Sequence, residues 1–103
     1  MAKLTDLKEM VYNMSIGDES AIYNGLNHNG AVIRMNGIMF AANFKFKKSS
    51  IIDAIKKLTE DNTEFNGYTV SQFAFAALDV IGIEKYQGND ENIKELIDYK
   101  FVF

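Results

Sequence analysis

The strongest fold signal lies in residues 21–46, AIYNGLNHNGAVIRMNGIMFAANFKF, in which two Asn-Gly pairs, Asn29-Gly30 and Asn36-Gly37, fall where two-residue hairpin turns would need them. Asn-Gly is the preferred dipeptide of two-residue hairpin turns. A type I′ turn at Asn36-Gly37 would sort the apolar residues of both flanks onto one face, namely Ala31, Ile33, Met35, Ile38, Phe40 and Ala42. Asn29-Gly30 as a second turn would add a third strand. We therefore predict a three-stranded antiparallel meander with strands over 21–28, 31–35 and 38–46.

Helical spacing of apolar residues predicts the elements around this meander. Residues 5–14 carry one amphipathic stripe, and residues 51–60 carry another behind a capping-box-like start at Ser50 and Asp53. Thr69 with Gln72 makes a capping box, and Gly82 matches a left-handed C′ residue, so a helix is expected over 70–81. This helix is apolar almost all round, which indicates a central helix or half of an interface. Asn89 or Asp90 can cap a short last helix.

The last five residues, 99–103, alternate aromatic and other residues as a strand does. We therefore expect this tail to add a fourth, C-terminal strand to the sheet. The predicted class is α+β, with the meander packed against three or four helices in the order αβββααα(β). The length and composition predict a single domain over 1–103.

Composition excludes several chemistries. The chain has no cysteine and one histidine. Disulfides, thiolate zinc sites and cysteine nucleophiles are therefore ruled out. His28 lies in a predicted hairpin loop with no orienting carboxylate or nucleophile nearby in sequence. Acidic clusters at 18–19, 60–64 and 90–91 fall at predicted turns or helix ends and match no calcium loop. We predict a protein that is not an enzyme, with no catalytic residue, metal site or cofactor.

The apolar content points to a binding role. Five Met, eight Phe and five Tyr exceed what a small sheet and four short helices are expected to bury. Exposed Tyr and Met are typical of partner surfaces. We predict a small interaction module, a binder or inhibitor of another protein, such as a phage or mobile-element accessory protein that blocks a host factor. An open sheet edge would also allow a homodimer. The expected partner-binding residues are Tyr23, Val32, Met39, Tyr99 and Phe101.

Two alternative functions stay open. Residues 1–58 hold eight basic and five acidic side chains, which suggests a phosphate-binding patch for weak nucleic-acid association. Its members would be Arg34, Lys45, Lys47, Lys48, Lys56 and Lys57. A patch with one arginine lacks the usual base-reading groups, so nucleic acid is the weaker alternative. The other alternative is a small-ligand or nucleotide pocket between sheet and helices, although no phosphate-cradling glycine motif is present.

The sequence also bears on location. No apolar stretch follows Lys3 as a secretory signal would require, and no run of about 18 uncharged apolar residues occurs anywhere in the chain. We therefore expect a cytoplasmic protein with no membrane partner.

Overall fold

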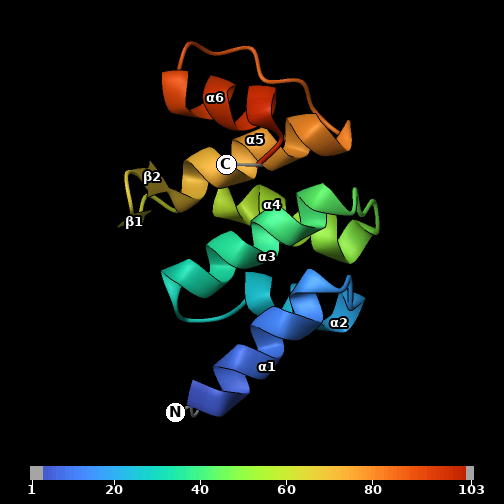
Figure 1. Cartoon of the computed structure of the whole chain (residues 1–103). Helices are drawn as coiled ribbons and strands as arrows, with labels where there is room; N and C mark the ends of the chain where they lie inside the picture. Colours follow the sequence, from blue (N-terminus) through green and yellow to red (C-terminus); the bar gives the residue numbers. More distant parts are fainter. Residues whose placement is uncertain (1–3, 102–103) are drawn as a thin grey trace.

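A computed structural model describes residues 4–101 and shows a mainly helical protein. Figure 1 shows a stack in which α1 and α2 form one end, α3 and α4 come next, and α6 covers α5 at the other end. The predicted α+β class is therefore wrong, and the fold is closer to a helical bundle. The elements are α1 (Leu4–Ser15), α2 (Glu19–Leu26), α3 (Ala31–Asn43), α4 (Ser49–Leu58), β1 (Glu64–Phe65), β2 (Tyr68–Thr69), α5 (Val70–Ile81) and α6 (Glu91–Tyr99).

The predicted meander is replaced by α2 and α3. A type I′ turn needs a positive φ at both central residues, and neither Asn29-Gly30 nor Asn36-Gly37 has one. Gly30 is the N-cap of α3, and Asn36-Gly37 lies in the middle of that helix. The hairpin signal does apply to another Asn-Gly pair, at 66–67, where φ is 56° and 88° and the turn joins β1 to β2.

Close helix packing explains the two glycines that the meander assigned to a turn and a strand. A Cβ on Gly37 would lie 3.0 Å from the backbone nitrogen of Leu26 and 3.2 Å from the carbonyl carbon of Gly25. A Cβ on Gly25 would lie 2.5 Å from the sulfur of the fully buried Met14. Gly37 therefore lets the backbones of α3 and α2 approach closely, and Gly25 leaves room for the Met14 side chain of α1.

Local capping chemistry defines several helix ends. Helix α5 covers the predicted 70–81, with the Thr69–Gln72 capping box formed in both directions and Gly82 left-handed at φ 91°. The α6 cap is Asp90, one of the two predicted candidates, and its carboxylate accepts from the backbone N–H groups of the first turn. The predicted helix over 5–14 is confirmed as α1. The predicted start of α4 is wrong: Lys48 is its N-cap and makes no side-chain capping bond.

The expected C-terminal strand is also corrected. Tyr99 ends α6, and the next two residues, Lys100 and Phe101, have left-handed φ values of 51° and 62°. These values turn the chain back onto the core, where the rings of Phe101 and Phe73 pack edge to face with centroids 5.2 Å apart. The remaining two residues of that predicted strand, 102 and 103, lie outside the described residues.

The core is centred on α5, which contacts α3, α4 and α6. This position accounts for its nearly continuous apolar sequence, because neighbours cover it on several sides. Its buried residues are Val70, Phe73, Ala74, Ala76, Ala77, Leu78 and Ile81.

Candidate binding groove

An open apolar groove runs between α3 and the β1–β2 hairpin, and we call it the α3–hairpin groove. Its volume is about 430 Å³. This volume lies within the range of about 300–1,000 Å³ that is common for ligand sites. None of its lining residues is charged. They are Val32, Met35, Asn36 and Met39 on α3, Phe65, Asn66 and Tyr68 on the hairpin, and Phe73 on α5.

The α3 wall follows from helical periodicity. Its four residues have the spacing i, i+3, i+4 and i+7, which places them on one face across two turns. Val32 is 39% exposed and Met39 is partly buried, whereas Met35 is buried against the core. The Asn36 amide donates to the carbonyl of Val32 at 3.0 Å, which leaves its side-chain oxygen as an acceptor. This wall is therefore apolar, with one hydrogen-bonding group in it.

The hairpin wall is held by contacts to α5 and α6. The Tyr68 ring packs on Phe73 with centroids 5.7 Å apart. The Tyr68 hydroxyl donates to a Glu95 carboxylate oxygen at 2.5 Å. This hydrogen bond, together with burial and the negative charge of Glu95, raises the pKa of Tyr68. Phe65 is left 49% exposed at the groove.

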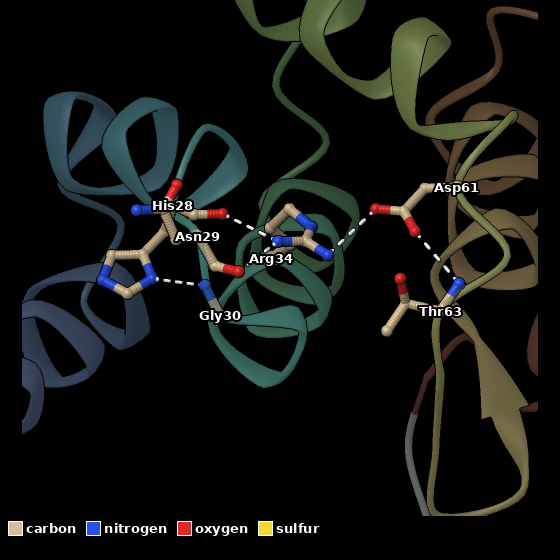
Figure 2. Close-up of polar contacts among 6 residues, drawn as sticks. All are labelled: His28, Asn29, Gly30, Arg34, Asp61 and Thr63. Atoms are coloured by element: carbon tan, nitrogen blue, oxygen red, sulfur yellow. Dashed lines mark hydrogen bonds and ion pairs between the residues drawn. The ribbon is translucent and has the colours of Figure 1, made fainter.

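An ion pair links the two walls. Arg34 on α3 contacts Asp61 at 3.0 Å, and the Asp61 carboxylate accepts from the backbone N–H of Thr63, immediately before β1. Figure 2 shows that Arg34 also reaches back to the loop before α3. There it donates to the carbonyls of His28 and Asn29 at 2.9 and 2.7 Å. Arg34 thereby ties the start of the hairpin to α3.

Electrostatics keep this ion pair charged. Burial raises the pKa of the Asp61 carboxyl, but the hydrogen bonds from Thr63 and the charge and hydrogen bond of Arg34 outweigh that effect. The pKa of Asp61 therefore lies below its usual value. The side chains of Arg34 and Asp61 are only 14% and 22% exposed, so solvent screens the pair less than a surface pair.

The structure separates the five predicted partner-binding residues. Val32 and Met39 come together in the groove. Tyr23 is exposed on α2, beside a different depression that Lys48 also lines, and Tyr99 is exposed at the end of α6. Phe101 is only 4% exposed, because the left-handed turn after α6 folds it onto Phe73. The expected aromatic surface at the C-terminus therefore lacks one of its two members.

The predicted basic patch is divided in the same way. Arg34 is held by Asp61 and two backbone carbonyls, so it is not a free surface cation. Lys48 precedes α4 and pairs with Glu19 at 2.6 Å. Lys56 and Lys57 lie in the last turn of α4, where they complement the helix dipole. The remaining lysines, Lys45 and Lys47, are exposed in the loop between α3 and α4.

Other polar residues singled out in the sequence have local structural roles. The Nδ1 atom of His28 accepts from the backbone N–H of Gly30 at 2.9 Å and so closes the turn before α3 (Figure 2). Asp18 caps α2 through the backbone N–H groups of Ser20 and Ala21, which lowers its pKa. Within residues 4–101, no three His, Asp or Glu side chains gather as a metal site. Among the same residues, no helix is long and apolar enough to cross a membrane.

Sequence reasoning missed the hairpin side of the groove. The Asn66-Gly67 pair was the available signal, but strands of two residues carry no alternation that could reveal them. Comparisons with protein-family models, curated proteins and solved structures found no significant match. The functional proposal therefore depends on the residues of this chain alone.

Proposed function

We propose that this protein is a non-enzymatic interaction module that binds another protein through the α3–hairpin groove, as a binder or inhibitor. One observation carries the proposal. Val32 and Phe65 face the groove from two different elements and remain 39% and 49% exposed, although burial of apolar side chains is what stabilises a small domain. Exposed apolar side chains that converge on a groove are typical of protein-binding sites.

The contacts that hold the groove walls in place favour a preformed site. The Arg34–Asp61 ion pair, the Tyr68–Phe73 contact and the Tyr68–Glu95 hydrogen bond connect its walls to α3, α5 and α6. A rigid apolar groove reduces the ordering cost of binding. Helix-in-groove recognition uses this kind of surface.

Affinity capture from the source cell, with matched variants, tests the proposal. The groove variants are Val32→Glu, which keeps a good helix former, and Phe65→Thr, which keeps a good strand former. The control is Tyr23→Gln, since Tyr23 is also exposed but lies outside the groove. We expect one stoichiometric protein, retained at high salt by wild type and Tyr23→Gln and lost from both groove variants. Thermal melting checks that every variant is folded.

Two results would contradict this function. Capture that survives both groove substitutions would place the binding surface elsewhere, and loss in Tyr23→Gln alone would point to α2. Recovery of nucleic acid that is lost at high salt would instead favour the exposed lysines.

A small apolar ligand is the second candidate, favoured by the groove volume of about 430 Å³. It predicts that a panel of apolar metabolites and nucleotides raises the melting temperature of wild type but not of Val32→Glu. Absence of any such stabilisation would leave the protein partner as the occupant.

A further inference from the structure

Resting on the proposed function, we infer the chemistry of the partner: the groove takes a short apolar segment of another protein that carries positive charge, and Glu64 and Glu95 select it. No charged residue of the described part of the chain lines the groove, so the part of the partner that contacts the lining is apolar. The charge preference comes from the rim, which differs between the two walls.

The α3 wall is electrically neutral. Arg34 is the one charged residue of α3, and its guanidinium is neutralised by the Asp61 carboxylate at 3.0 Å. No charged side chain from this helix is therefore left to attract or repel a partner along the face from Val32 to Met39.

The hairpin wall is acidic. Glu64 is exposed next to Phe65 but lies on the opposite face of β1, so it acts on the groove as a nearby charge within a Debye length and not as a lining residue. Glu95 lies at the hydroxyl end of the Tyr68 ring that lines the groove. The nearest lysine in sequence to Glu95 is Lys94, which is 4.0 Å from a different carboxylate, that of Glu91. Residues 59–103 as a whole hold nine acidic and three basic side chains, so this part of the chain is net negative. A basic partner is attracted to this wall and an acidic one is repelled.

The same charges argue against a second copy of this chain as the occupant. A two-fold dimer through this groove would bring two acidic rims into one interface. Like charges in an interface oppose association. Among the described residues, no lysine lines the groove: of the exposed lysines in the predicted patch, Lys45 and Lys47 lie in the loop after α3, and Lys56 and Lys57 lie in the last turn of α4.

The size of the groove limits the segment. The α3 face runs over the eight residues from Val32 to Met39, and the seven steps between them span about 10 Å at the helical rise. A segment of two helical turns matches this length and can present one apolar stripe with lysine or arginine beside it.

Designed peptides test the inference with the full chain. The probes are three fluorescein-labelled amphipathic helices with the same leucine stripe, whose polar positions are all lysine, all glutamate or all glutamine. Anisotropy titrations are run at about 0.05 M and about 0.5 M salt, because exposed charges are screened at the higher value. We expect the lysine peptide to bind about tenfold more tightly than the glutamine peptide at low salt, as two exposed ion pairs allow. At high salt this advantage disappears.

Matched variants separate rim charge from overall charge. Glu64→Gln with Glu95→Gln removes both rim charges and keeps an acceptor for the Tyr68 hydroxyl, so the lysine and glutamine peptides should then bind equally. Glu9→Gln with Glu84→Gln removes two exposed charges that do not line the groove, so the preference for lysine should persist. Val32→Glu should abolish binding of the glutamine peptide.

Four outcomes overturn the inference, three from the peptide titrations and one from sedimentation. Those from the titrations are equal binding of all three peptides, a lysine preference that survives the loss of both rim charges, and binding of none of them. A sedimentation shift to a dimer that Val32→Glu abolishes also overturns it, because the occupant is then a second copy. In the first two cases the capture experiment with Val32→Glu and Phe65→Thr still decides the proposed function independently.

Discussion

Replacing Arg34 by methionine tests whether burial sets the strength of the ion pairs in this protein. Arg34 makes charged contacts with Asp61 at 3.0 Å and with the carbonyls of His28 and Asn29 at 2.9 and 2.7 Å. Lys48 and Glu19 form a second pair that is shorter, at 2.6 Å, but their side chains are 60% and 42% exposed. Distance alone predicts that the Lys48 pair is the stronger one. Burial predicts the opposite, because water screens the Lys48 pair.

The magnitude follows from the contacts that Arg34→Met removes. A hydrogen bond to a charged group contributes about 1.5–3 kcal/mol when it is shielded from water, and part of each Arg34 contact is open to solvent. We therefore expect Arg34→Met to lower the free energy of unfolding by about 3 kcal/mol, since methionine retains the apolar packing of the arginine stem. For a domain of this size, that change lowers Tm by about 12–24 °C. Lys48→Met should change stability by less than about 0.5 kcal/mol.

Thermal and urea unfolding of wild type and both variants measure these differences. A double-mutant cycle of Arg34→Met with Asp61→Asn isolates the pair itself, with an expected coupling of about 1 kcal/mol for a partly exposed pair. Equal losses in Arg34→Met and Lys48→Met, or a larger loss in Lys48→Met, would refute the reasoning from burial.

Three further predictions concern the Asn-Gly pairs and acid stability, each measured by thermal or acid unfolding. Asn36→Ala should raise the free energy of unfolding by about 0.5 kcal/mol because position 36 is helical. Asn66→Ala should lower it by about 1 kcal/mol because φ at position 66 is 56°. A loss of stability in Asn36→Ala would favour a turn at that site. Gly37→Ala should lower stability despite the better helix propensity of alanine, because the new Cβ would lie 3.0 Å from the nitrogen of Leu26; a gain would show that α2 and α3 can separate at little cost. The pKa of Asp61 lies below its usual value in the folded protein, so the ionised carboxylate stabilises the fold fully above about pH 5, and this contribution is lost as pH falls through the folded pKa. Asp61→Asn should therefore make stability less dependent on pH in the acid range. An unchanged pH dependence would contradict the assignment.

The candidate groove was only partly accessible from the sequence. Val32 and Met39 were both expected to bind a partner, and they do come together, on one face of helix α3. Positions 32 and 39 are seven apart, and a continuous strand would put them on opposite faces because its side chains alternate. A helix puts them two turns apart on the same side. Phe65, Tyr68 and Phe73 could not be assigned to the same groove, because only folding brings the hairpin beside α3.

Arg34 shows a second limit of sequence reasoning. Its position near several lysines suggested a basic patch, yet its partner Asp61 lies 27 residues away and reaches it only after α4 turns the chain back. The charge of a side chain can be read from sequence, but whether a second charge neutralises it depends on packing.

The sequence by itself determined the elements whose signals are local. Helix α5 follows the Thr69–Gln72 capping box and is closed by Gly82, as expected, and α6 is capped by Asp90, one of the two expected residues. These signals are local because a cap is made by residues within four positions of one another. Only the tertiary structure decided that residues 31–43 form a helix. That segment is apolar at most positions, so it satisfies both a strand pattern and a helix pattern. As a helix, this segment crosses α2 closely at Gly25 and Gly37 and packs against α5. These contacts bury its apolar side chains and so stabilise the helix over a strand.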